Sequence, residues 1–189
     1  NPSRSLSTYY EGQILGDIWG YTTHGIAKTD AEMEEWLKTN DQSRLGSNWG
    51  AGDIMYKNLD DKATIDNGSN TLDDHGDLRV IGNSNPRFRF GLNLGADWKG
   101  FDLSLFFQGI MKRDVWLSGP YFWGADGGLW QSVGFEEHLD YFRPADTDSY
   151  FGPNENAYFP KPYLGGRGDK NHYVQTRYLQ DGSYIRLKN

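Results

Sequence analysis

Residues 85–110 constrain the fold of this chain more than any other stretch. Apolar residues occupy every second position in two runs, 88–98 and 101–107, and a Lys99-Gly100 pair separates the runs. This alternation is typical of strands with one apolar and one polar face. A short glycine-containing turn between two such runs predicts a β-hairpin. The first arm, residues 87–97, matches the roughly 9–11 residues that a tilted strand needs to cross a bilayer.

The composition favours a β-rich protein and excludes several other classes. The chain has 189 residues and a formal net charge of −7, which argues against a nucleic-acid partner because phosphate contacts require Lys and Arg. It has no Cys, so disulfides, thiol nucleophiles and thiolate metal sites are excluded. Mean hydropathy is −0.76, and no apolar run approaches the roughly 18 residues of a transmembrane helix. Membrane β-barrels escape that criterion because their strands alternate.

The sequence before the hairpin predicts short strands, one helix and a polar loop. Residues 9–26 are punctuated by Gly and indicate short strands joined by turns. Thr29 and Glu32 have the spacing of a capping box, and the apolar residues that follow predict one short helix near 30–38. Residues 58–77 are rich in Asp, Asn and Gly, which is typical of a surface loop.

The sequence after the hairpin predicts one long loop and one more strand. Residues 111–171 show no sustained alternation, and long connections of this kind are usually functional. Residues 178–189 alternate like another strand. Because a strand needs a turn and a neighbour, we expect the chain to be a fragment of a longer protein.

No motif for covalent catalysis stands out. The four His residues are scattered, and no G-x-S-x-G nucleophile elbow is present. Adjacent carboxylates such as Glu136 and Glu137 keep a glycosidase open as a third class, since that chemistry uses two carboxyls about 5–10 Å apart. Calcium in the acidic loop 58–66 is disfavoured, because Lys62 occupies a ligand position and Ala63 replaces the expected Gly. We expect no metal, no cofactor and no enzymatic activity.

Aromatic residues gather in the long loop and supply a candidate binding site. Flat rings with polar edges bind sugars and peptides, and they also pack loops against each other. The candidate substrate-binding residues are Trp116, Tyr121, Trp123 and Trp130.

Four stretches, in order along the chain, match the pattern of one known family. They are EGQILGDIWGYTTHGI at 11–26, GDIMYKNLDDKATID at 52–66, VIGNSNPRFRFGLNLGADWKGFDLSLFFQG at 80–109 and RYLQDGSYIRLKN at 177–189. Together they resemble the SusC/RagA-type TonB-dependent outer-membrane transporters of Bacteroidetes. The chain departs from the family's acidic loop at Asn58, Lys62 and Ala63, which argues against a cation site there.

The resemblance implies an all-β fold. Residues 1–189 are then antiparallel strands from the C-terminal portion of a 22-stranded transmembrane barrel with long extracellular loops, and the plug domain and TonB box lie outside them. The implied function is TonB-dependent uptake of glycans, oligosaccharides or peptides through the outer membrane. The implied partners are a SusD-like lipoprotein, outer-membrane lipid, and the TonB complex through the missing N-terminal part.

In that barrel the hairpin has a lipid face and a lumen face. The residues expected to face lipid are Phe88, Phe90, Leu92, Leu94 and Trp98 of the first arm and Phe101, Leu103, Leu105 and Phe107 of the second. The residues expected to face the lumen are Arg89, Asn93 and Asp97. The alternative is a soluble extracellular glycan-binding β-domain that uses the aromatic loops as its sugar platform.

Overall fold

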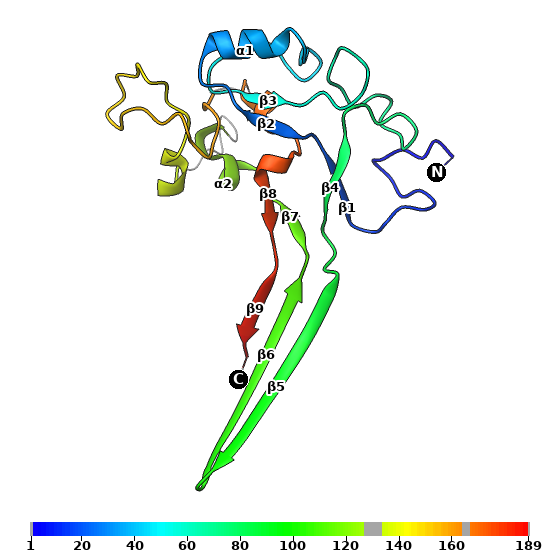
Figure 1. Cartoon of the computed structure of the whole chain (residues 1–189), viewed down its shortest axis with the longest axis vertical. Helices are drawn as coiled ribbons and strands as arrows, with labels where there is room; N and C mark the ends of the chain where they lie inside the picture. Colours follow the sequence, from blue (N-terminus) through cyan, green and yellow to red (C-terminus); the bar gives the residue numbers. More distant parts are fainter. Residues whose placement is uncertain (1, 127–133, 164–166, 189) are drawn as a thin grey trace.

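The computed structural model describes residues 2–126, 134–163 and 167–188. Figure 1 shows a compact head, from which a long stem projects. The head comprises the described residues of 2–83 and 113–182, and the stem comprises residues 84–112 and 183–188. The stem is the hairpin that the sequence predicts, together with one further strand.

Most of the regular elements are strands, which is consistent with an all-β fold. The strands are β1 (Asp17–Gly20), β2 (Thr23–Ile26), β3 (Ile54–Tyr56), β4 (Arg79–Asn83), β5 (Phe88–Trp98), β6 (Phe101–Met111), β7 (Asp114–Trp116), β8 (Leu179–Asp181) and β9 (Tyr184–Leu187). The helices are α1 (Asp30–Leu37) and α2 (Pro120–Trp123), with 3₁₀ turns η1 (Gly124–Asp126), η2 (Glu136–Leu139), η3 (Asp169–Asn171) and η4 (Thr176–Tyr178). The described residues form several small sheets and no closed barrel.

The stem is a three-stranded antiparallel sheet in the order β5-β6-β9. β5 and β6 pair without a bulge from Phe88 opposite Met111 to Trp98 opposite Phe101. The turn between them is the predicted Lys99-Gly100 pair, and both residues have positive φ, 48° and 87°. Two-residue hairpin turns of type I′ require this conformation. The predicted hairpin is therefore confirmed, including its turn.

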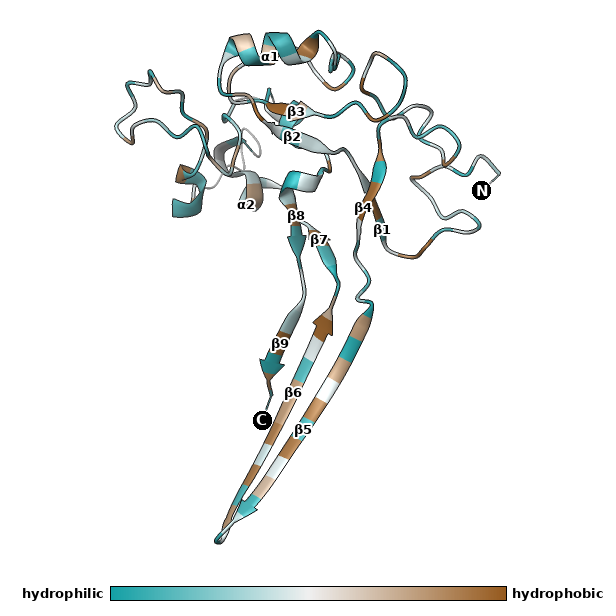
Figure 2. Ribbon diagram, viewed as in Figure 1, coloured by the Kyte–Doolittle hydropathy of each residue, from teal (hydrophilic) through white to brown (hydrophobic). Residues whose placement is uncertain are grey.

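The register gathers most of the apolar residues of the stem on one face. Residues directly opposite each other share a face, so the face takes its members from the alternate positions of all three strands. They are Phe88, Phe90, Leu92, Leu94, Ala96, Trp98, Phe101, Leu103, Leu105, Phe107, Met111, Ile185 and Leu187. Trp98 and Phe101 are 68% and 75% exposed, and Figure 2 shows the alternating hydropathy along both arms. We call this surface the apolar face of the stem.

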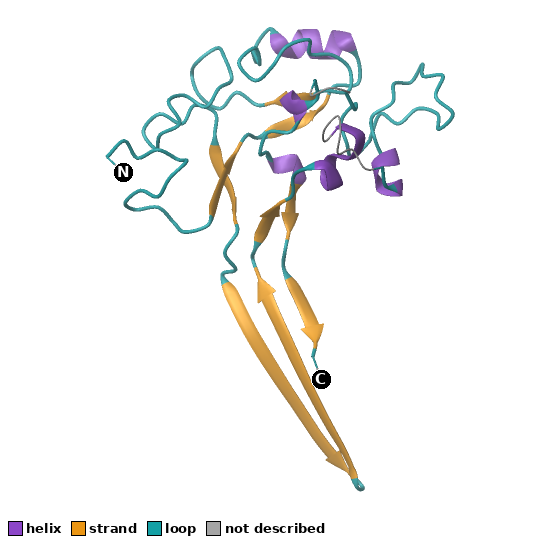
Figure 3. Ribbon diagram, turned by 180° about the vertical axis from the view of Figure 1, so that it is seen from behind, coloured by secondary structure: helices purple, strands orange, loops and turns teal. Residues whose placement is uncertain are grey.

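The three strands of the stem continue into the head after breaks at one level. β4 leads into β5 across residues 84–87, β6 into β7 across 112–113, and β8 into β9 across 182–183, as Figure 3 shows. Lys112 lies in the left-handed region with φ 53°. β7 and β8 then pair again above the break. The single strand predicted for residues 178–189 is consequently two short strands.

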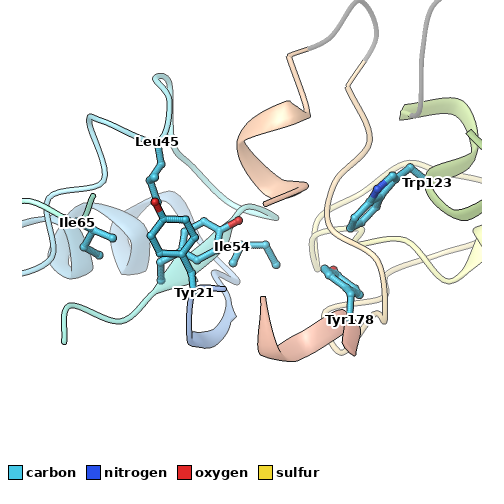
Figure 4. Close-up of a cluster of buried hydrophobic side chains, with 7 residues drawn as sticks. Tyr21, Leu45, Ile54, Ile65, Trp123 and Tyr178 are labelled. Atoms are coloured by element: carbon cyan, nitrogen blue, oxygen red, sulfur yellow. The ribbon is translucent and has the colours of Figure 1, made fainter. Parts of the chain in front are cut away.

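The core of the head joins residues from distant parts of the chain. The buried cluster consists of Tyr21, Leu45, Ile54, Tyr56, Ile65, Trp123 and Tyr178. Figure 4 shows Trp123 and Tyr178 facing each other, and their ring centroids lie 4.9 Å apart at 83°. Edge-to-face contacts of this kind add to the stabilisation that area burial provides.

Helix α1 begins at the capping arrangement that the sequence predicts. The Thr29 hydroxyl accepts a hydrogen bond from the Glu32 amide at 3.1 Å, and the Glu32 carboxylate accepts one from the Lys28 amide at 2.6 Å. Met33 is fully buried, and the Trp36 indole donates to the Tyr56 carbonyl at 3.2 Å. The helix thus covers strand β3.

The expectation of a single helix and of an unstructured loop at 111–171 is wrong. The described part of that stretch contains β7, α2 and three 3₁₀ turns. It also supplies Trp123, Phe142 and Ala157 to the interior. Trp123 and Phe142 thus pack inward from backbone outside the strands, where no alternation marks them. Within the described part of the chain, no helix combines the length and the apolarity needed to cross a membrane.

Two glycines of the stem test its packing. A Cβ atom at Gly109 would lie 2.5 Å from Phe90 Cζ and 2.6 Å from the Tyr184 carbonyl oxygen, so we expect Gly109→Ala to lower the free energy of unfolding by about 1–3 kcal/mol through overpacking. At Gly95 the nearest atom would be 3.9 Å away. Gly95→Ala should therefore leave the free energy of unfolding unchanged. Urea titrations of both variants measure this quantity, and equal decreases in the two variants would contradict the register described above.

Candidate functional site

The structure gives different surroundings to the three described residues among the four aromatics that the sequence singles out. Trp116 ends β7 opposite Leu179 and is partly buried against the core. Trp123 is 7% exposed and belongs to the core, whereas Tyr121, two residues earlier on α2, is 75% exposed. Trp130 lies outside the described residues. Of the three described residues, Tyr121 is the one whose ring is available to a ligand.

Tyr121 forms one wall of an open groove on the head. Its ring stacks on Phe135, with centroids 6.4 Å apart at 27°. The groove has a volume of about 570 Å³, and its lining adds polar groups of Glu137, Asp140 and Gln180. The Gln180 amide donates to the Tyr158 hydroxyl at 2.7 Å. Flat rings beside amide and carboxylate groups suit a sugar or a peptide. We call this site the Tyr121 groove.

A smaller hollow of about 330 Å³ lies on the other side of the same aromatic cluster. Its lining includes Trp123, Phe135, His138 and Phe159. His138 Nδ1 accepts a hydrogen bond from the Phe135 amide at 3.0 Å, so in the neutral ring Nε2 carries the proton and donates to the Phe122 carbonyl at 3.1 Å. Nδ1 of His138 thereby caps η2, and Nε2 joins η2 to α2.

An Asp–His pair lies beneath this hollow. His172 Nε2 is 3.0 Å from Asp126 Oδ2, and the His172 ring stacks on Trp123 with centroids 4.1 Å apart. Asp126 Oδ1 accepts from the Tyr163 amide at 3.1 Å. A Cβ atom at Gly168 would lie 2.1 Å from both carboxylate oxygens of Asp126, so this close approach requires glycine. These contacts join residues 120–126 to residues 163–172.

A buried ion pair supports the head on the side of β3. Lys170 Nζ is 2.7 Å from Asp53 Oδ2, and the two side chains are 5% and 0% exposed. The ammonium also donates to the carbonyl oxygens of Asn48 at 2.7 Å and Ser47 at 3.2 Å. Every Nζ proton of Lys170 therefore has an acceptor.

Both carboxylate oxygens of Asp53 also accept hydrogen bonds from neighbouring groups. Asp53 Oδ1 accepts from the Asn171 amide group at 2.9 Å, and Oδ2 accepts from the Gly50 amide at 2.9 Å and the Tyr163 hydroxyl at 3.2 Å. Burial, followed by the charge of Asp53, raises the pKa of Tyr163. Tyr163 consequently stays protonated and acts as a donor. The sequence does not predict this network, because its members lie far apart in the chain and no local pattern links them.

The acidic loop 58–66 is held by the chain's own groups. Both oxygens of Asp77 accept backbone amides, those of Leu59 at 2.6 Å and Asp66 at 3.0 Å. Lys62 Nζ lies 3.2 Å from Asp74 and 3.8 Å from Asp60. Hydrogen bonds from Ser69 and then Lys62 lower the pKa of Asp74. Among the described residues, no group of three or more His, Cys, Asp or Glu side chains is arranged to hold a metal ion.

Comparison with known proteins finds one informative relative. No protein-family model matches the chain. The chain is similar to a TonB-dependent receptor. That protein, TonB-dependent receptor P3 of Formosa agariphila, is 26% identical over 187 residues, which cover 98% of this chain and 16% of the receptor. The chain therefore spans about a sixth of the receptor's length. The similarity supports a relationship between nearly the whole of this chain and TonB-dependent receptors.

The ion pair predicts a large difference between two lysines. Lys170→Met leaves the Asp53 carboxylate buried without its cation, so we expect the free energy of unfolding to fall by about 3–5 kcal/mol. Lys38→Met removes a lysine whose ion pair with Glu35 is exposed, and it should cause no measurable change. Urea titrations of both variants make the comparison, and an unchanged midpoint for Lys170→Met would contradict the structural role of the pair.

Proposed function

We propose that this chain forms part of the wall and outer surface of a TonB-dependent transporter in the outer membrane. The observation that carries the proposal is the apolar face of the stem, which lies exposed on one side of a regular sheet. The similarity to a TonB-dependent receptor supports it along nearly the whole chain. In this proposal the chain binds and admits a solute, and it has no covalent chemistry.

The dimensions of the stem suit a membrane wall. β5 and β6 have 11 residues each, so each is roughly 35 Å long at about 3.3 Å per residue. A strand tilted by about 40° then spans roughly 27 Å, close to the apolar band of about 25 Å in outer-membrane barrels. Trp98 and Phe101 close the apolar face at the turn, where such barrels carry an aromatic girdle.

The asymmetry of the molecule supports an orientation. One end of the stem is the two-residue turn at Lys99-Gly100, and the other end leads into the whole head. Outer-membrane barrels have short periplasmic turns and long extracellular loops. We therefore place the turn at the periplasmic rim and the head outside the cell.

The finer assignment follows the resemblance to the SusC/RagA family. Under it, residues 1–189 are the C-terminal part of the barrel, and the plug and TonB box belong to other parts of the protein. The substrates are oligosaccharides or peptides, and a SusD-like lipoprotein covers the outer side. The Tyr121 groove is our candidate for a substrate contact, because it combines a stacked aromatic pair with polar groups on the head.

The Tyr121 groove also favours the second candidate, a soluble extracellular glycan-binding domain. The two functions differ in what covers the apolar face of the stem. A barrel wall needs detergent to leave the membrane fraction, whereas a soluble domain appears in the supernatant without it. Fractionation of cells that produce the whole protein distinguishes them.

Two adjacent positions on β5 test the lipid face. Leu92 lies opposite Phe107 on the apolar face, and Asn93 lies opposite Phe106 on the other face; both are exposed. An Arg on a lipid face near the midplane costs about 2–4 kcal/mol, so Leu92→Arg should reduce the outer-membrane level of the whole protein. Asn93→Arg should not. Equal levels of the two variants in membrane immunoblots would reject the proposal.

Tyr121 tests the groove. Loss of one stacked ring should raise the half-saturating concentration for the transported solute about three- to tenfold in Tyr121→Ala cells, with an unchanged outer-membrane level. Tyr150→Ala is the matched control, because Tyr150 is 96% exposed and lies outside the groove. A similar change in both variants would argue against a substrate contact at Tyr121.

A further inference from the structure

The face of the stem opposite the apolar face carries a group of cations next to the head. Arg89 of β5 lies opposite Ile110, which in turn lies opposite Tyr184 of β9. One row further from the head, Gly91, Gln108 and Arg186 lie side by side. The Lys188 amide donates to the Phe106 carbonyl at 2.8 Å, so Lys188 continues the ladder and shares the face of Arg186. We call Arg89, Arg186 and Lys188 the basic band.

No side chain of the basic band forms an ion pair within the described residues. The ion pairs within residues 2–126, 134–163 and 167–188 involve other side chains. The acids on the same face, Asp97 and Asp102, lie opposite each other beside the turn. Asp97 is six residues beyond Gly91, or roughly 20 Å at about 3.3 Å per residue, which exceeds the screening length of about 8–10 Å in physiological salt. The acids at the turn therefore do not neutralise the basic band. The carboxylates on its head side, Asp17, Asp114 and Asp181, line a separate pocket with Arg87 and Lys112.

Aromatic rings lie between these cations. The Arg186 guanidinium carbon is 4.0 Å from the centre of the Tyr184 ring. The Phe106 ring fills the space at Gly91, where an added Cβ would lie 3.0 Å from Phe106 Cε2. A planar guanidinium binds a carboxylate or a sulfate through two parallel hydrogen bonds, and a flat ring accommodates the apolar face of a sugar.

We propose that the basic band and its two rings bind an oligosaccharide that carries carboxylate or sulfate groups. This inference rests on the proposed function, in which the polar face of the stem lines the lumen, and it adds the charge class of the solute. Binding is confined to the end of the stem near the head, because Asp97 and Asp102 repel an anion at the turn. The Tyr121 groove recognises rings, whereas the basic band selects for negative charge.

The test uses the whole protein, purified in detergent, with two probes of equal chain length. Dextran sulfate oligosaccharide is the anionic probe, and unmodified dextran is the neutral one. We expect the protein to bind dextran sulfate and not dextran in titration calorimetry at 0.1 M salt. The triple variant Arg89→Gln, Arg186→Gln, Lys188→Gln should bind dextran sulfate about tenfold more weakly or not at all.

A second triple variant, Lys38→Gln, Lys57→Gln, Lys99→Gln, removes the same charge from exposed positions outside the basic band and should bind like the unmodified protein. Equal weakening in both triples overturns the proposal, and so does unchanged binding in the first. Failure of the unmodified protein to prefer dextran sulfate also overturns it and favours an acidic protein segment on this face. The outer-membrane levels of all proteins are measured alongside, because their absence from that membrane would reject the proposed transporter instead.

Discussion

The buried ion pair between Asp53 and Lys170 is the interaction on which the head depends. It joins residues 117 positions apart in the sequence. Asp53 accepts further hydrogen bonds from Asn171, Gly50 and Tyr163, and Lys170 donates to the carbonyls of Asn48 and Ser47. A buried charge that loses its partner is far less stable than the intact pair. The positions of strand β3 and of the turn at η3 therefore depend on each other. The packing of the aromatic core between them depends on both.

The stem is stabilised in a different way. Its two long strands, β5 and β6, are neighbours in the sequence and pair along their whole length, with β9 added at one edge. Its apolar face is exposed in the isolated chain. The head is an assembly of distant segments around a buried interior, whereas the stem is built on a local hairpin whose apolar face needs a covering. Under the proposed function, lipid supplies that covering on one face and the lumen receives the other.

This difference explains which features the sequence could predict. The hairpin, its Lys99-Gly100 turn and the cap at Thr29 depend on residues a few positions apart, so their patterns are visible without a structure. The burial of Lys170 and Asn171 depends on Asp53, far earlier in the chain, and no local pattern signals it. Tyr121 and Trp123 show the same limit at the candidate site, because a one-turn helix exposes one ring and buries the other according to what packs beneath it. The sequence does not single out Phe135, the partner of Tyr121, for the same reason.

The three breaks at the junction of stem and head have a consequence for how such a protein can diverge. Because β4–β5, β6–β7 and β8–β9 are all interrupted at one level, the regular pairing below the junction meets the pairing above it through irregular backbone contacts, such as the hydrogen bond from the Gly182 amide to the Arg113 carbonyl at 2.8 Å. Insertions, deletions or repacking in the head can then accumulate without shifting the register of the sheet below. Under the proposed function, the head that contacts the solute and the sheet that forms the wall can therefore diverge at different rates, because three short connections join them.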